Sequence, residues 1–274
     1  MKRLITAGVT VPVVLAGIFL LPSLGFFFAV LAALEIAVLE FVRLTRAWAP
    51  SAPRMALLVL VPAAAVWLAP VLISGTVEPV SWEYLLAGVL ALTVGAASLV
   101  LFGGTESHES MSALGVLCFG VIYFSLPVAT LYYLHRLDPW LVFLFCAIVW
   151  LGDTAAYYCG THWGRHKLSH VSPSKTWEGA IGGFLIALVA AAVWSHFRLG
   201  SVTPRAVVLA VVTAIAAQVG DLAESMLKRG AGVKDSGDLL PGHGGMLDRI
   251  DAMLFAAPAM VICLWLLGSE SFVR

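Results

Sequence analysis

Charged residues are scarce in this 274-residue chain, which contains 12% Asp, Glu, Lys and Arg against 61% hydrophobic residues. This balance excludes an ordinary soluble domain, in which about a quarter of the residues are charged. The 16 basic and 16 acidic side chains give a formal net charge of zero, which argues against nucleic acid as a partner. The composition therefore predicts an integral membrane protein that binds no nucleic acid.

Cysteine is also scarce, and the four cysteines show no CxxC spacing. Each lies inside an apolar stretch, which is typical of small core residues and predicts neither a disulfide framework nor a thiolate metal site. The sequence also lacks a GxxxxGK[ST] motif, so a Walker-type nucleotide site is excluded. The four residues are Cys118, Cys146, Cys159 and Cys263.

Long apolar runs are what the chain has in abundance. Each is long enough, as a helix, to cross a hydrocarbon layer of about 30 Å. The sequence therefore predicts an all-α, polytopic integral membrane protein with about nine transmembrane helices. We divide it into an N-terminal transmembrane helix array, 1–134, and a C-terminal candidate catalytic region, 135–274. The runs are 4–21, 24–42, 55–74, 84–102, 112–134, 140–159, 179–197, 206–226 and 252–267.

Most cations fall on one side of the membrane if the N-terminus is cytoplasmic, and the positive-inside rule favours that orientation. Two polar loops, 160–178 and 227–251, then face the cytosol together. The opening MKR and its apolar run have the look of a signal peptide, but no small-residue cleavage site follows, so we expect an uncleaved first helix. The cations on the opposite side are Arg136, Arg198, Arg205 and Arg274.

Two carboxylates and an ammonium fall on one stripe of the eighth apolar segment. Asp221, Glu224 and Lys228 follow the i, i+3, i+7 spacing of a helix face. Carboxylate oxygens are the hard ligands that Mg²⁺ requires, and Asp248 and Asp251 would supply more of them from the start of the ninth segment. The alternative is a set of interfacial ion pairs with the cations Lys228, Arg229 and Arg249.

A glycine-rich segment, 241–245, interrupts the charged loop and cannot be helical. Backbone N–H groups of glycines beside the start of a helix are a general way to hold phosphate. His243 lies in this segment and would donate to a phosphate oxygen or move a proton, although a merely solvated histidine fits equally well. The segment therefore predicts phosphate contacts by His243, Gly244 and Gly245.

Hydroxyls and a lysine precede the seventh apolar segment, in the other polar loop. Ser172, Ser174, Lys175 and Thr176 would form a phosphate site at a helix N-terminus. Capping by Thr176, together with the inside-positive charge, would explain the same residues without a substrate. The sequence leaves both explanations open.

Acids in the first half of the chain give a weaker signal. Glu35 and Glu40 lie within the second apolar segment and are candidates for functional intramembrane acids. Glu40 and Arg43, at i, i+3 spacing, would also form a simple interfacial pair. The acidic loop 103–110 needs no ligand to explain it, so we assign no functional residue in this half.

The order of polar residues in the second half resembles a known family. Lys228-Arg229 and then Lys234-Asp235 precede the run LPGHGGMLDRID at 240–251. This pattern closely resembles the C-terminal motif of the phosphatidate cytidylyltransferases, also called CDP-diacylglycerol synthases. The blocks 152–154, 172–179 and 218–224 look like the same family, so that the resemblance covers 149–256.

The resemblance implies transfer of the cytidylyl group of CTP to phosphatidate, which forms CDP-diacylglycerol and pyrophosphate by metal-assisted, direct in-line displacement. It also implies Mg²⁺, with room for a second cation, and a homodimer among the lipids of the cytoplasmic (inner) membrane with its site facing the cytosol. The implied catalytic residues are Asp221, Lys228, His243, Asp248 and Arg249, and the implied metal ligands are Asp221, Glu224, Asp248 and Asp251. The implied substrate-binding residues are Ser172, Ser174, Lys175, Thr176, Arg229, Lys234, Asp235, Gly244 and Gly245.

Two other functions fit parts of the same pattern. A CTP-dependent lipid-alcohol kinase would have similar polar C-terminal loops but would transfer the γ-phosphate of CTP. An ion-coupled transporter would use Asp153, Asp221 and Glu35 near the bilayer midplane, between broken helices. The phosphate that reaches the lipid distinguishes the first alternative, and the continuity of the helices at these acids distinguishes the second.

Overall fold

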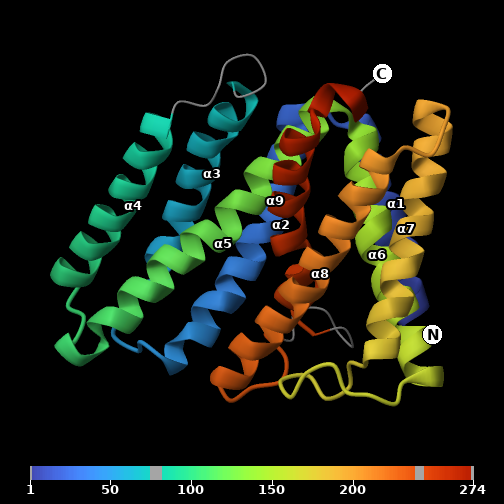
Figure 1. Cartoon of the computed structure of the whole chain (residues 1–274). Coiled ribbons are helices and arrows are strands. Elements are labelled where there is room, and N and C mark those ends of the chain that lie inside the picture. The colour runs from blue at the N-terminus through green and yellow to red at the C-terminus, as the bar shows by residue number, and fades with distance from the viewer. Residues whose placement is uncertain (1, 75–81, 238–243, 273–274) are drawn as a thin grey trace.

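The computed structural model describes residues 2–74, 82–237 and 244–272. In these residues the chain is all-α, and an isolated β-bridge joins Lys167 to Thr176. The α-helices of the described residues are α1 (Lys2–Leu20), α2 (Ser23–Leu44), α3 (Leu57–Ser74), α4 (Trp82–Phe102), α5 (Ser110–Leu137), α6 (Pro139–Trp163), α7 (Trp177–Leu199), α8 (Pro204–Gly230) and α9 (Leu247–Leu267) (Figure 1). Four short 3₁₀ turns accompany them: η1 (Thr45–Ala47), η2 (Arg54–Ala56), η3 (Ser107–Glu109) and η4 (Ser269–Phe272).

The apolar runs of the sequence all become helices, and they differ in their capacity to cross a membrane. Over the described residues, six helical segments are long and apolar enough to do so: Ser23–Ala47, Ser107–Leu137, Pro139–Trp163, Trp177–Leu199, Pro204–Gly230 and Leu247–Leu267. The shorter apolar helical stretches are Thr10–Leu20, Arg54–Ala69 and Leu86–Phe102. The all-α, multi-pass prediction is thereby confirmed, and the count of nine spans and the cytoplasmic N-terminus stay predictions.

Several helices extend beyond the apolar runs that predicted them. Thr176 accepts a hydrogen bond from the backbone N–H of Gly179 at 3.1 Å, which confirms the predicted start of α7. At the other polar loop, α8 continues to Gly230 and α9 already begins at Leu247. The loop predicted at 227–251 is therefore shorter than expected, and Asp248 and Asp251 belong to the first turns of α9.

Close helix pairs fix the second half of the molecule. Helices α6 and α7 approach so closely that a Cβ on Gly183 would lie 2.6 Å from the carbonyl oxygen of Gly152, and a Cβ on Gly179 would lie 2.7 Å from that of Ala156. Small residues at such crossings are how membrane helices gain contact area without a hydrophobic driving force. Helices α8 and α9 form a second such pair.

Two buried clusters run through the bundle. One is formed mainly by α6 to α9, with Phe145 and Met260 in its interior, and the other mainly by α2, α3 and α5, with Phe41 and Phe124. Helix α9 contributes to both, because Leu254 packs in the second cluster. The division near residue 134 stays a prediction, and both cores draw on residues from each side of it.

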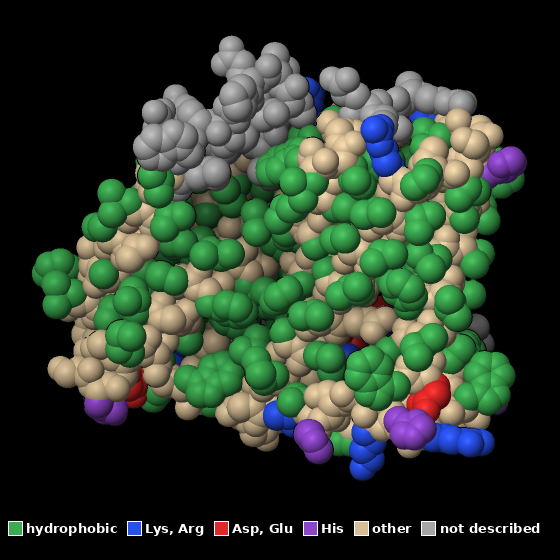
Figure 2. Space-filling view, viewed as in Figure 1, with side chains coloured by type: hydrophobic (Ala, Val, Ile, Leu, Met, Phe, Trp, Pro, Cys, Tyr) green, Lys and Arg blue, Asp and Glu red, His purple; other side chains and the backbone are tan. Residues whose placement is uncertain are grey.

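Charged side chains gather at one end of the bundle. The side of the molecule in Figure 2 is covered mainly by hydrophobic side chains, whereas Lys, Arg, His and acidic side chains line its lower edge. The α6–α7 and α8–α9 connections lie at this edge together (Figure 1). The two polar loops predicted to share one side of the membrane therefore share one end of the structure.

Candidate active site

Helices α8 and α9 meet closely where the first pair of acids lies. Gly220 has no side chain, and a Cβ there would lie 2.8 Å from the backbone oxygen of Asp251. This approach brings the carboxyl groups of Asp221 and Asp251 within hydrogen-bonding reach of each other. Two carboxyl groups in contact are unfavourable unless a proton or a cation lies between them. The pair is therefore a candidate cation-binding position.

Lys228 bridges the second pair of acids. Its Nζ lies 2.6 Å from Oε2 of Glu224, one helical turn away on α8, and 2.6 Å from Oδ1 of Asp248 on α9. The Glu224 side chain is completely buried, and only 13% of the Lys228 side chain is exposed. Breaking such a buried triad by removing one partner is strongly destabilising, since a charge is left uncompensated. The predicted stripe of α8 thus forms a charged seam against α9.

Asp248 also organises the chain that leads into α9. Its Oδ2 accepts hydrogen bonds from the backbone N–H groups of Gly245 at 2.8 Å and Ser236 at 3.0 Å. Gly244 has a φ of +75°, which favours glycine, and a Cβ there would lie 2.8 Å from Oδ2 of Asp248. The N–H of Gly245 is thus engaged by Asp248, and its contact with a phosphate stays a prediction.

Glu40 on α2, which the sequence marked only as a candidate intramembrane acid and which we left out of the predicted site, lies against the α8–α9 connection. It is 3% exposed, and its carboxylate accepts from the Ser236 hydroxyl at 3.0 Å and from the backbone N–H groups of Met246 at 2.9 Å and Leu247 at 2.8 Å. A Cβ on Gly245 would lie 2.4 Å from Oε2 of Glu40. Glu40 therefore caps the N-terminus of α9 from another helix and holds the α8–α9 connection against α2. The interfacial pair with Arg43, which its spacing also suggested, is not among the ion pairs of the described residues.

The α6–α7 connection places a lysine on the acids. The connection folds back on itself, because Leu168 N–H donates to Lys175 O at 2.8 Å and Trp177 N–H donates to His166 O at 2.9 Å. Lys175 thereby forms an ion pair with Asp221 of α8. Thr176 is the helix cap, so the capping explanation holds for Thr176 while Lys175 reaches the acidic site.

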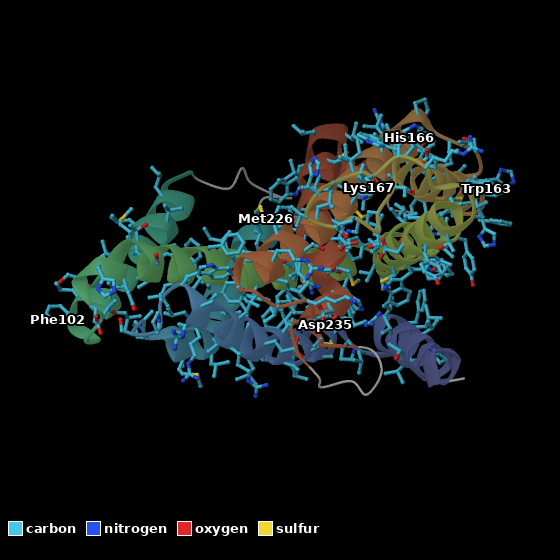
Figure 3. All side chains as sticks on the ribbon, turned by 90° about the horizontal axis from the view of Figure 1, so that it is seen from below. Phe102, Trp163, His166, Lys167, Met226 and Asp235 are labelled. Carbon is cyan, nitrogen blue, oxygen red and sulfur yellow. The ribbon has the colours of Figure 1, made fainter. Side chains whose placement is uncertain are left out.

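Most of the remaining candidate residues are exposed at the charged end of the molecule. Viewed from the charged end, His166 and Lys167 of one connection and Asp235 of the other lie on the same face of the molecule (Figure 3). Ser174, Arg229, Lys234, Asp235 and Arg249 are exposed, and Ser172 is half-buried. Arg229 donates to Val233 O at 3.4 Å. His243 lies outside the described residues, so its role stays a prediction.

The first half also supplies a residue that sequence reasoning missed. Tyr123 of α5 is 5% exposed, and its hydroxyl has no hydrogen-bond partner within the described residues. It lies close enough to Asp251, Glu224 and Asp221 to interact with them electrostatically. A tyrosine within an apolar helix gives no sequence signal that separates it from a core aromatic residue.

The sequence predicts that the acidic residues are metal ligands. Among the residues that the structure describes, no group of three or more His, Cys, Asp or Glu side chains is clustered tightly enough to hold one ion. The donor chemistry nonetheless fits Mg²⁺, because the oxygens are hard ligands and Oε1 of buried Glu224 has no hydrogen-bond partner in the described chain. In this arrangement Lys175 and Lys228 supply the positive charge beside the carboxylates.

The fold and site define a class of protein: an all-helical, multi-pass membrane protein with acids and lysines gathered at one end of its helices. A sequence model of the cytidylyltransferase family matches residues 1–267. The chain belongs to this family, which confirms the resemblance seen in the second half.

Individual relatives agree over part of the chain. It is 46% identical over 117 residues to a phosphatidate cytidylyltransferase of Haemophilus influenzae, which covers 40% of this chain and 41% of the relative. It is 37% identical over 159 residues to the phosphatidate cytidylyltransferase of Bacillus subtilis, which covers 55% and 58%. A Brucella suis protein of the same name is 42% identical over 148 residues, which covers 52% and 54%. The chain thus spans about half the length of the curated relatives that it matches.

Proposed function

We propose that this protein transfers the cytidylyl group of CTP to phosphatidate and releases CDP-diacylglycerol and pyrophosphate. The observation that carries the proposal is the buried Glu224–Lys228–Asp248 triad beside the Lys175–Asp221 pair, in a chain of the cytidylyltransferase family. The relatives from H. influenzae and B. subtilis bear the name phosphatidate cytidylyltransferase. A site at one end of membrane helices is accessible to a soluble nucleotide and to a lipid held in the leaflet.

The reaction joins two anions. A phosphate oxygen of phosphatidate attacks the α-phosphorus of CTP, the bond from that phosphorus to the oxygen bridging to the β-phosphorus breaks, and pyrophosphate leaves with the bonding electrons. We propose direct in-line displacement without a covalent enzyme intermediate. Positive groups fixed around the phosphates are the main catalytic requirement of such a step, because negative charge must be brought together and then stabilised on the leaving group.

Lysines already held beside the acids would provide that charge. Lys228 has two carboxylate partners and Lys175 has one, so either ammonium remains able to donate a further hydrogen bond to a phosphate oxygen. Arg229, Lys234 and Arg249 are exposed, and we assign them to the phosphates of CTP. The other substrate contacts are assigned to Ser172, Ser174, Thr176, Asp235, His243, Gly244 and Gly245.

Asp221, Glu224, Asp248 and Asp251 would hold Mg²⁺, and a second cation has the same set of oxygens available. When bound, the metal would supply Lewis-acid stabilisation of phosphate charge. The carboxylates themselves hold Lys175 and Lys228 in position before substrate arrives. Asp248 in addition fixes the glycine segment through its two backbone N–H contacts.

The membrane setting of this reaction is part of the proposal. We place the protein in the cytoplasmic (inner) membrane with the charged end in the cytosol, because the cations gather there. A homodimer follows from the family resemblance. The transporter alternative fits less well, since α6 and α8 run unbroken through Asp153 and Asp221, whereas ion-coupled transporters use discontinuous helices at such acids.

The test is a purified, full-length protein in detergent with Mg²⁺, phosphatidate and CTP labelled at either the α- or the γ-phosphate. The α-label is expected in CDP-diacylglycerol, and pyrophosphate is expected in equal amount. Transfer of the γ-label to lipid would instead identify a lipid kinase and refute the proposal.

A substitution links this activity to the site. Asp221→Asn is expected to lower turnover at least about a hundredfold, the size of effect found when one stabilising group is removed from a catalytic site. Glu106→Gln is the matched control, because Glu106 lies in an exposed loop at the same end of the molecule. Near-normal turnover of Asp221→Asn in a protein that melts like the wild type would exclude Asp221 from the site.

A further inference from the structure

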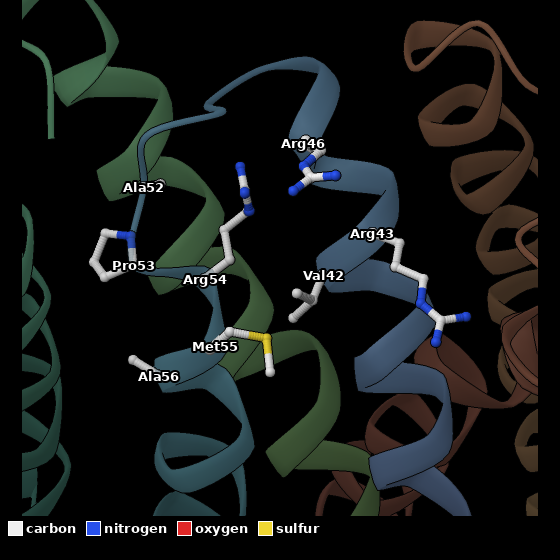
Figure 4. A pocket seen from close by; sticks show the side chains of 8 residues that line it. All are labelled: Val42, Arg43, Arg46, Ala52, Pro53, Arg54, Met55 and Ala56. Atoms are coloured by element: carbon white, nitrogen blue, oxygen red, sulfur yellow. The ribbon is translucent and has the colours of Figure 1, made fainter.

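A pocket of about 410 Å³ opens between the end of α2 and the start of α3. It lies at the charged end of the bundle and shares no residue with the acid–lysine site (Figures 1 and 4). Val42, Met55 and Ala56 form apolar wall, and Arg46 and Arg54 contribute guanidinium groups. A pocket with apolar walls and a few convergent polar groups is the usual form of a small-ligand site.

The two arginines approach one another although both are positive. Figure 4 shows the side chains of Arg46 and Arg54 reaching toward the same opening from η1 and η2, and the two charges are close enough to repel. Arg46 makes no ion pair within the described residues. An anion between the two would relieve the repulsion, since opposite charges within about 4–6 Å stabilise each other.

Glu109, the acid whose charge acts on Arg54, already has hydrogen-bond partners. Glu109 accepts from the backbone N–H of Ser51 at 2.8 Å and from its hydroxyl at 2.6 Å. The same hydroxyl accepts from the backbone N–H of Glu106 at 3.0 Å, and Arg54 donates to the carbonyl oxygen of Ala49. The segment that carries Arg54 is therefore held in place, and Arg54 is a fixed wall of the pocket.

Positive charge at this end of the molecule also has a simpler explanation, namely orientation of the protein in the membrane. Arg43 distinguishes that explanation from ligand binding. Cations at helix ends orient membrane proteins without any ligand, and Arg43 serves that purpose equally well. Its guanidinium points away from the opening in Figure 4, although its position borders the pocket. Orientation of the protein requires only charge at this end, whereas convergence of Arg46 and Arg54 on one opening is what a phosphate requires.

We propose that this pocket binds a phosphate ester at the membrane face, gripped by Arg46 and Arg54 with its organic end against Val42 and Met55. Guanidinium groups match phosphate oxygens through paired hydrogen bonds. Basic pockets between helices at the membrane surface bind lipid headgroups in this way. The two possible sources are the headgroup of an anionic phospholipid and a soluble phosphate ester.

The test uses the full-length protein and phosphatidylglycerol, which carries a phosphate ester but is not the proposed substrate. Native mass spectrometry of detergent-solubilised protein measures the binding of phosphatidylglycerol against phosphatidylcholine. Arg46→Gln is expected to weaken phosphatidylglycerol binding about tenfold, because it removes one charge-assisted contact. Arg43→Gln removes the same charge from the same helix end and is expected to change binding less than about twofold. Equal effects of the two substitutions would overturn the proposal.

A second variant guards against a folding defect in the first. Met55 is 61% exposed, so Met55→Trp would narrow the pocket mouth without loss of charge or burial of a polar group. It is expected to weaken phosphatidylglycerol binding while the melting temperature in phosphatidylcholine stays at the wild-type value. Full binding by both Arg46→Gln and Met55→Trp would refute the site.

Glycerol 3-phosphate separates the two sources. If millimolar glycerol 3-phosphate displaces phosphatidylglycerol from the wild type but not from Arg46→Gln, the pocket serves soluble phosphate esters. If it displaces none while Arg46→Gln still weakens lipid binding, the pocket serves the lipid headgroup. Binding of neither probe by the wild type would overturn the proposal as a whole.

Discussion

Replacement of Glu40 by Gln tests whether a residue of α2 positions the proposed active site. Glu40 is buried, and its two oxygens accept hydrogen bonds from Ser236, Met246 and Leu247. Glutamine keeps the shape but has only one accepting oxygen. If that oxygen keeps Ser236 and Leu247, which share Oε2 in the wild type, the amide NH₂ faces the N–H of Met246.

The expected cost follows from these contacts. A buried donor left without an acceptor costs about 1–3 kcal/mol, and a hydrogen bond to a charged group contributes about 1.5–3 kcal/mol. The free energy that holds the start of α9 closed is therefore expected to fall by about 1.5–3 kcal/mol. At about 1.4 kcal/mol per factor of ten, opening of this segment becomes roughly ten to a hundred times more frequent.

Amide hydrogen exchange of the peptide that contains Met246 and Leu247 measures this opening directly. Glu35→Gln is the matched control, because Glu35 lies on the same helix and its buried Oε1 has no hydrogen-bond partner in the described residues. We expect faster exchange and lower turnover in Glu40→Gln, and wild-type exchange in Glu35→Gln. Equal exchange in the two variants would refute the positioning role of Glu40.

Two further predictions concern the α8–α9 seam. Lys228→Met leaves two buried carboxylates without their ammonium, which costs about 3–5 kcal/mol of stability. The melting temperature in detergent is therefore expected to fall sharply. Addition of Glu224→Gln to the same chain is expected to restore part of the melting temperature but not the turnover. A melting temperature of Lys228→Met equal to that of the wild type would contradict the burial of the triad. Gly220→Ala places a Cβ 2.8 Å from the backbone of Asp251, so a loss of about 1–3 kcal/mol is expected from overpacking. Gly95→Ala is its control, because an added Cβ there meets nothing within 4 Å. Equal melting temperatures of the two glycine variants would contradict the close packing of α8 against α9 at Gly220.

The helices could be predicted from the sequence because the signal is local. An apolar run of sufficient length forms a helix in a membrane whatever its neighbours are, and every predicted run is helical where the structure describes it. The ends were less predictable. Helix α9 begins at Leu247, before its apolar run, because Glu40 from α2 accepts from the N–H groups of its first turn.

The site divides in the same way. The Glu224–Lys228 contact is an i, i+4 pair on one helix, so the helix spacing predicts it. The contact of Lys228 with Asp248 joins two helices, and the sequence indicated only that both residues belong to one polar region. The sequence marked Glu40 as a candidate acid, but its contacts could not be predicted, since it lies 207 residues before Leu247 and no local pattern links an acid in an apolar helix to a distant glycine loop.

The charges of the site agree with the proposed divalent cation. Asp221, Glu224, Asp248 and Asp251 carry four negative charges when all are ionised, and Lys175 and Lys228 return two. Uncompensated charge beside membrane helices is expensive, so two further positive charges, or protons on the acids, are needed. The contact between Asp221 and Asp251 is where the balance is poorest, because two carboxyl groups meet there and, among the described residues, only Asp221 forms an ion pair with a lysine. The proposed Mg²⁺ would supply the missing charge at that contact, and the phosphates of the substrates would form ion pairs with Lys175 and Lys228.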